Sequence, residues 1–96
     1  MFDKMIRNFR HKGLQKLFVS GSRKGIPPDM AVRLTLQLDA LHAAANVQDL
    51  NLPGYHLHEL QGAREGTWAI TVRANWRITF RFMDGDALDV DFEDYH

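Results

Sequence analysis

The sequence predicts an α+β domain in which a short strand and two helices precede an antiparallel sheet. In the first half of the chain, apolar residues recur at the three-to-four-residue spacing of a helix. From Tyr55 onward they alternate with polar residues, which is the period of a half-buried strand. Because the strands follow the helices as a block, we expect a meander whose one face is covered by both helices.

A chain of 96 residues has room for one hydrophobic core, so we expect a single domain over residues 1–96. No stretch approaches the roughly 20 apolar residues that span a bilayer, and the N-terminus lacks the apolar run of a signal peptide. The sequence contains no cysteine, which excludes disulfides, thiol catalysis and cysteine-bound zinc. We therefore expect a cytoplasmic protein that does not associate with membranes.

The first half divides into three predicted elements. Residues 6–9 form a candidate strand, and a first helix is expected over about residues 12–20, ending near Gly21. A second helix should open at Pro27-Pro28-Asp29 and run to about Ala45. Its apolar positions at helical spacing are Val32, Leu34, Leu38 and Leu41.

The second half contains three strands and a plausible fourth. Alternation is clear in residues 68–73, 76–82 and 88–93, and residues 55–60 could add a strand. In that fourth strand, His56 and His58 should both point to the polar face of the sheet.

The alternation also predicts which residues face one another, because a one-residue slip would turn every side chain to the other face. A three-residue loop, Asp84-Gly85-Asp86, keeps the apolar residues of the last two strands on one face. It places Arg81 opposite Asp89, Thr79 opposite Asp91, and Arg77 opposite Glu93.

The preceding hairpin follows the same rule with an Arg73-Ala74-Asn75 loop. This loop pairs Val72 with Trp76 and Ile70 with Ile78. Extending both hairpins brings Asn75, Arg77 and the chain end at residues 94–96 to one end of the sheet.

The net charge of zero conceals an uneven distribution. Residues 1–34 contain eight Lys/Arg and two acids, whereas residues 35–96 contain four Arg and ten acids. A basic half suits a polyanionic partner such as RNA, although a solvated helix face would also be rich in lysine. The candidate polyanion-binding residues are Arg7, Arg10, Lys12, Lys16, Arg23 and Lys24.

The predicted cluster fits the cleavage of RNA. The 2′-hydroxyl of RNA supplies the nucleophile, so the protein needs a base, an acid and cations that stabilise the charged phosphorus intermediate. His58 and His96 exchange protons near neutral pH, and Arg77 offers a planar donor group for phosphate. Tyr95 could stack on a base, and Asp94 could orient a histidine.

Two other interpretations of these residues stay open. Arg77 could pair with Glu93, Asn75 could serve the left-handed conformation of a turn, and Tyr95 could cover the core edge. Metal binding is the weaker alternative, because the His56-x-His58 spacing is common by chance and lacks a companion motif. We therefore expect neither a metal nor another cofactor.

At this point the chain resembles a known family. The run W-A-I-T-V-R-A-N-W-R-I-T-F at residues 68–80 and the terminal E-D-Y-H at residues 93–96 resemble HigB toxins. These are members of the RelE/ParE superfamily, also called plasmid maintenance system killer proteins. Residues 5–14 and 57–62 match as well, so the resemblance extends from about Met5 to His96. Residues 1–4 lie outside it, and we expect them to be an extension beyond the core.

The resemblance implies a RelE/ParE-like fold and a ribosome-dependent endoribonuclease, the toxin of a type II toxin–antitoxin system. It implies two partners, the 70S ribosome with its mRNA and a HigA-like helix-turn-helix antitoxin, through which alone the toxin would meet operator DNA. Its catalytic residues map onto His58, Arg77, Asp94, Tyr95 and His96.

We expect three further residues, Asn75, Arg73 and Arg64, to bind the substrate. One departure from the family concerns Gln61, which stands where a relative has lysine, so that a cationic role there is lost or passes to Arg64.

Two alternative functions remain. The chain could be a ParE-like inhibitor that binds DNA gyrase without cutting RNA, or an inactive member that survives as a partner-binding protein. The set of His58, Arg77 and His96 favours the ribonuclease, because an inhibitor that acts by binding has no evident need of paired proton carriers.

Overall fold

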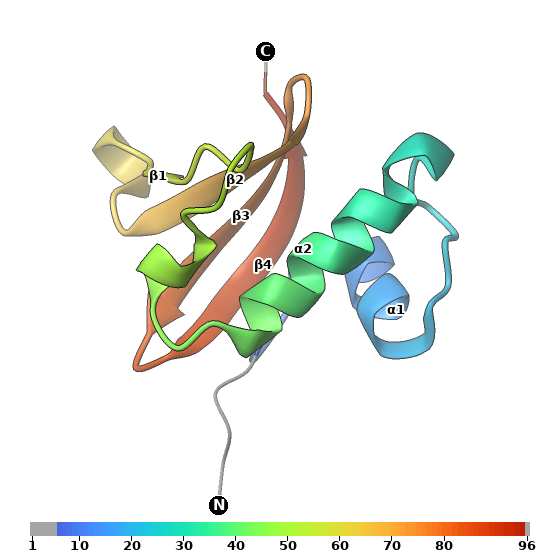
Figure 1. Cartoon of the computed structure of the whole chain (residues 1–96), viewed down its shortest axis with the longest axis horizontal. Coiled ribbons are helices and arrows are strands. Elements are labelled where there is room, and N and C mark those ends of the chain that lie inside the picture. The colour runs from blue at the N-terminus through green and yellow to red at the C-terminus, as the bar shows by residue number, and fades with distance from the viewer. Residues whose placement is uncertain (1–5, 96) are drawn as a thin grey trace, which may run out of the picture.

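In the computed structural model, which describes residues 6–95, two helices cover one face of a four-stranded antiparallel sheet with strand order β1-β2-β3-β4 (Figure 1). The helices are α1 (Lys12–Ser20) and α2 (Ala31–Ala43). The strands are β1 (His58–Glu59), β2 (Thr67–Arg73), β3 (Trp76–Met83) and β4 (Asp86–Asp94). Three short 3-10 helices connect them: η1 (Pro28–Met30), η2 (Val47–Leu50) and η3 (Gly62–Arg64). The α+β prediction is confirmed, while the expected extension at residues 1–4 lies outside the described residues.

Helix α1 has the bounds that its sequence predicts, because both ends carry a capping residue. The His11 side chain accepts a hydrogen bond from the Leu14 N–H at 3.1 Å, which satisfies a free donor of the first turn. At the other end Gly21 adopts a left-handed conformation, with φ 76°, and its N–H donates to the Leu17 carbonyl. Glycine meets this geometry without strain, so the helix ends there.

Helix α2 begins after η1 rather than at the prolines, and it ends at Ala43 rather than Ala45. Its buried stripe contains Ala31, Leu34, Leu38 and Leu41. The expectation for Val32 was wrong, since its side chain is 62% exposed. One residue corresponds to about 100° of rotation in a helix, which turns Val32 away from the stripe that begins at Ala31.

The core lies between this stripe and the helix-facing side of the sheet. Ile70, Ile78, Phe80 and Val90 are fully buried there and pack with the leucines of both helices. Burial of such side chains contributes about 1.5–3 kcal/mol each. The same packing leaves the opposite face of the sheet to polar residues.

Residues 6–9 do not form the continuous strand that we expected. They make two isolated parallel bridges to β4, Ile6 with Ala87 and Phe9 with Val90. The reason lies in β4, where Asp89 has a φ of 53° and interrupts the regular backbone between the two bridges. The segment nevertheless covers the β4 edge, because the Arg7 and Arg10 N–H groups donate to its carbonyls.

The β3–β4 turn has two residues, Asp84 and Gly85, and not the predicted three. Both have positive φ, as the Asp-Gly type I′ turn requires, and Met83 therefore pairs with Asp86. A bulge then restores the alternation, so that Thr79 faces Asp91 and Arg77 faces Glu93 as predicted. Inside the bulge the prediction was wrong, since Arg81 faces Leu88 and not Asp89.

The β2–β3 hairpin repeats this pattern. Arg73 pairs with Trp76 across a two-residue turn, so the predicted Val72–Trp76 pair was wrong, while the Ile70–Ile78 pair is confirmed. The left-handed position of this turn belongs to Ala74, with φ 51°, and not to Asn75.

Strand β1 is shorter than expected. It contains only two residues, and His56 precedes it in a left-handed conformation with φ 50°. His56 and His58 therefore do not share one face of a strand. No helix within residues 6–95 is long and apolar enough to cross a membrane.

Candidate active site

The face of the sheet opposite the helices carries the candidate site. Residues paired across neighbouring strands point to the same face, and one such row contains His58, Ala69, Thr79 and Asp91. The next row contains Thr71, Arg77 and Glu93. Tyr95 follows Glu93 by two residues, so the strand period directs it to the same side.

The end of β4 is fixed to the β2–β3 turn. The Tyr95 N–H donates to the Asn75 carbonyl at 2.7 Å, and Trp76 pairs with Asp94. In Figure 1 the end of β4 lies beside this turn. The prediction that Asn75, Arg77 and the chain end meet at one end of the sheet is confirmed for residues up to Tyr95. His96 lies outside the described residues.

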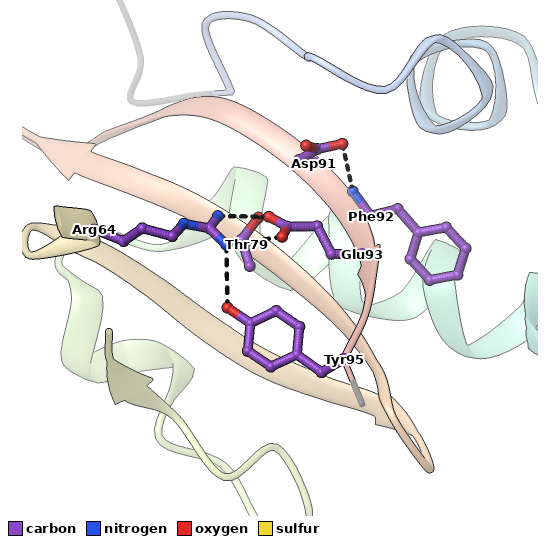
Figure 2. Close-up of polar contacts among 6 residues, drawn as sticks. All are labelled: Arg64, Thr79, Asp91, Phe92, Glu93 and Tyr95. Atoms are coloured by element: carbon purple, nitrogen blue, oxygen red, sulfur yellow. Dashed lines mark hydrogen bonds and ion pairs between the residues drawn. The ribbon is translucent and has the colours of Figure 1, made fainter. Parts of the chain in front are cut away.

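Arg64, on η3, binds the side chains of two residues at the end of β4 (Figure 2). Its two terminal nitrogens donate to the two carboxylate oxygens of Glu93 at 2.8 and 2.6 Å. Its Nη1 also lies 3.2 Å from the Tyr95 hydroxyl oxygen. A bidentate pair of this kind fixes direction as well as distance, so Arg64 holds the Tyr95 ring by its hydroxyl end.

Glu93 is ionised within this network. The hydrogen bond from Arg64 lowers the pKa of the Glu93 carboxyl below its usual value, and a hydrogen bond from the buried Thr79 hydroxyl lowers it further. Glu93 in turn raises the pKa of Arg64. The two charges stabilise each other, and the pair stays intact at neutral pH.

Arg77 approaches the same tyrosine from its ring face. Its guanidinium carbon lies 5.8 Å from the centre of the Tyr95 ring, which is within cation–π range. Its Nη1 donates to the Ala74 carbonyl at 2.7 Å, which anchors the side chain at the turn. The alternative in which Arg77 bonds to Glu93 does not hold, because Glu93 bonds to Arg64 and Thr79 instead. Tyr95 is thus held by two arginines.

His58 is exposed on the short edge strand β1, and Arg77 lies two strands away on β3. Along the strand direction the two residues are offset by two positions, because His58 lies in the row of Thr79. With strands about 4.8 Å apart and residues about 3.3 Å apart, their Cα atoms are separated by roughly 12 Å. The His58 Nδ1 lies 2.9 Å from the His56 carbonyl oxygen, which orients the ring.

The side chains of other predicted residues lie outside this cluster, although the Asn75 carbonyl joins it by accepting from the Tyr95 N–H. Arg73 forms an ion pair with Asp29 of η1, and Asn75 is exposed in the turn. In the basic half, Arg7 pairs with Asp86 at 2.8 Å. The remaining predicted cations are exposed: Arg10 lies just before α1, Lys12 and Lys16 lie on α1, and Arg23 and Lys24 lie in the following loop.

Sequence reasoning missed the roles of Thr79 and Glu93. A pair between Glu93 and Arg77 was one of two open interpretations, and Thr79 was not assigned to the site. The period-two alternation already put both residues on the polar face. The alternation could not predict the position of Arg64, because Arg64 lies on η3, an element that the sequence pattern did not predict.

Comparison with known proteins supports the resemblance. Residues 7–96 match the family described as RelE-like toxin of type II toxin-antitoxin system HigB. "Endoribonuclease HigB" of Proteus vulgaris is 50% identical over 92 residues, which cover 96% of this chain and 100% of that protein. "Toxin HigB-1" of Vibrio cholerae serotype O1 is 31% identical over 87 residues, covering 88% of this chain and 92% of that protein. The chain therefore belongs to the HigB family of RelE-like toxins of type II toxin–antitoxin systems.

Proposed function

We propose that this toxin is an endoribonuclease that cuts mRNA on the ribosome, with the polar end of its sheet as the active site. The observation that carries the proposal is the placement of Tyr95 by Arg64 and Arg77, on the same sheet face as His58. The 50% identical relative, which spans nearly the whole chain, is named an endoribonuclease.

The side chains fit metal-free cleavage. The 2′-oxygen attacks phosphorus while a base removes its proton, and the P–O5′ bond breaks as an acid protonates the leaving oxygen. We assign the two proton transfers to His58 and His96, with Asp94 orienting a histidine. Arg77 stabilises the added negative charge, since its fixed donor group remains charged throughout. Tyr95 stacks on a base beside the scissile bond.

Dependence on the ribosome follows from how open this site is. His58 is exposed, and its Cα atom lies roughly 12 Å from that of Arg77, so we propose that the described residues alone do not hold an RNA strand in the in-line geometry. Holding the reacting groups in that geometry accounts for much of the rate enhancement of an enzyme. We propose that the decoding site of the ribosome provides it and that the exposed cations of the basic half bind ribosomal RNA.

A toxin of a type II system has an antitoxin partner. We propose that this antitoxin is a HigA-like helix-turn-helix protein, that both act in the cytoplasm, and that the toxin meets operator DNA only through its antitoxin.

A reconstituted translation system with a programmed 70S ribosome tests the proposal. His58→Gln, Arg77→Gln and His96→Ala should each lower the cleavage rate at least 100-fold, the scale of a lost acid–base or charge-stabilising group. Glu65→Gln, an exposed change outside the cluster, serves as the control and should leave the rate unchanged. Rapid cleavage of free RNA by the purified toxin would contradict the ribosome-dependent mechanism.

Mapping transcript ends in cells separates the alternatives. New 5′ ends that disappear in the His96→Ala variant support cleavage. Growth arrest with unchanged ends would instead indicate a gyrase inhibitor, and no effect on growth would indicate an inactive member.

A further inference from the structure

A second polar feature lies on the same sheet face, beyond the Arg64–Glu93 pair. It is a pocket of about 240 Å³ between η3, the sheet and the N-terminal segment. Three arginines line it, each from a different part of the chain: Arg10, Arg64 and Arg81. The other lining residues are Ala63, Thr67, Thr79 and Asp89.

Two of these arginines form no close ion pair among the described residues, although Arg10 interacts electrostatically with Glu93 from a longer distance. Arg64 is bonded to Glu93, but within residues 6–95 neither Arg10 nor Arg81 forms an ion pair or a side-chain hydrogen bond, and both are exposed. The single acid of the lining, Asp89, accepts a hydrogen bond from the Asn8 amide at 2.8 Å. The pocket therefore offers more cationic donor groups than the protein itself uses.

We propose that this pocket, which we call the arginine pocket, binds a backbone phosphate of RNA at a distance from the bond that is cut. The inference rests on the proposed function, because it takes the Tyr95 end of the sheet as the place of cleavage. Arginine presents its donors in a planar fork that matches a phosphate, and three such groups converging on a hollow suit an anion better than a neutral ligand.

The fold determines the distance between the arginine pocket and the proposed cleavage site at Arg77. Arg81 follows Arg77 by four residues on the same strand and the same face, which is roughly 13 Å. Stacked nucleotides rise about 3.4 Å each, and an extended strand rises more. If the phosphate belongs to the mRNA, it should therefore lie two to four nucleotides from the scissile one. Arg64 belongs to both places, because it lines the pocket and bonds to the Tyr95 hydroxyl.

The phosphate belongs either to the mRNA or to ribosomal RNA. Replacing the mRNA linkages one at a time by uncharged ones distinguishes these two sources. A single methylphosphonate is placed in turn at each of the five linkages on either side of the cleavage site of a ribosome-bound mRNA. For the mRNA source, one position two to four nucleotides away should lower kcat/KM of the wild type by roughly 5- to 20-fold, as expected for one lost charge-assisted contact.

The double variant Arg10→Gln/Arg81→Gln completes the experiment. On unmodified mRNA its kcat/KM should be lower than that of the wild type by a similar factor. A neutral linkage at the critical position should lower this kcat/KM little further, since the contact is then already gone. Glu65→Gln is the control, because it is an exposed change outside the pocket lining and should remain sensitive to that linkage.

Three other outcomes are informative. If the double variant binds 70S ribosomes without mRNA less tightly and no linkage is critical, the phosphate belongs to ribosomal RNA. If the double variant cleaves mRNA and binds ribosomes like the wild type, the proposal is overturned. If it loses affinity for the antitoxin alone, the pocket binds an acidic protein segment and the proposal is equally wrong.

A non-cleavable strand keeps the test independent of catalysis. Binding of a 2′-deoxy oligonucleotide to the isolated toxin should weaken with salt, and each lost phosphate contact makes the slope of log K against log salt shallower by about 0.7. The pocket variant should show this change, and the Glu65→Gln control should keep the wild-type slope. If the wild type fails to cut ribosome-bound mRNA yet shows this difference, the proposed function fails and the arginine pocket stands.

Discussion

Replacing Glu93 by Gln tests the network that holds Tyr95. Glutamine preserves the size of the side chain and one acceptor oxygen, so the change removes the charge with little loss of packing. Arg64 then loses its ionic partner, and the Thr79 hydroxyl donates to a neutral oxygen rather than to a carboxylate.

The cost follows from exposure. The Arg64 side chain is 42% exposed and the Glu93 side chain 23%, so solvent screens the pair, and exposed pairs contribute about 0.2–1 kcal/mol. The bidentate geometry places this pair at the upper end of that range. A hydrogen bond to a charged acceptor exceeds a neutral one by about 1 kcal/mol. We expect E93Q to lower the free energy of unfolding by about 1–2 kcal/mol, and Tm by roughly 5–10 °C.

The effect should depend on pH in a defined direction. The folded state lowers the pKa of Glu93 below its ordinary value of 4.5, so the carboxylate stabilises the fold above about pH 4.5. That stabilisation is lost as the pH falls through the folded pKa. The difference between wild type and E93Q should therefore be largest near neutral pH and should shrink on acidification.

Urea unfolding, followed by tryptophan fluorescence at pH 7 and at pH 3.5, measures both quantities. Arg73→Gln provides the control, because the Arg73–Asp29 pair is 60% and 57% exposed and should contribute less than about 0.5 kcal/mol. A difference for E93Q that is equally large at both pH values would refute the ionic account and indicate a packing defect.

Three further predictions concern the turns and the tyrosine. Ala74→Gly should raise the free energy of unfolding by about 0.5–1 kcal/mol in thermal melts, because alanine is strained at φ 51°. Gly85→Ala should lower it by about 1 kcal/mol for the same reason, at φ 85°. Arg64→Gln should reduce kcat for ribosome-bound mRNA about tenfold, since Tyr95 loses the donor at its hydroxyl, and Arg64→Lys should restore only part of it. Single-turnover cleavage rates measure this effect, and an unchanged kcat in Arg64→Gln would remove Arg64 from the positioning of Tyr95.

The hairpins show how far a periodic pattern can predict register. Parity correctly required Arg77 to face Glu93 and Ile70 to face Ile78. It could not distinguish a three-residue loop from a two-residue turn followed by a bulge, because both restore the same alternation. The Asp84-Gly85 pair was the available signal for the shorter turn.

The sequence by itself determined the helix-then-sheet order, the ends of α1 and the face on which Arg77, Glu93 and Tyr95 lie. These features depend on neighbours a few residues apart, through capping geometry and the two periods of helix and strand. Only the tertiary structure decided that Arg64 bonds to Glu93 and Tyr95, across 29 and 31 residues, and that Arg10 joins Arg81 at one pocket. Such contacts arise where separate segments pack on one sheet face, and no local period encodes which segments will meet there.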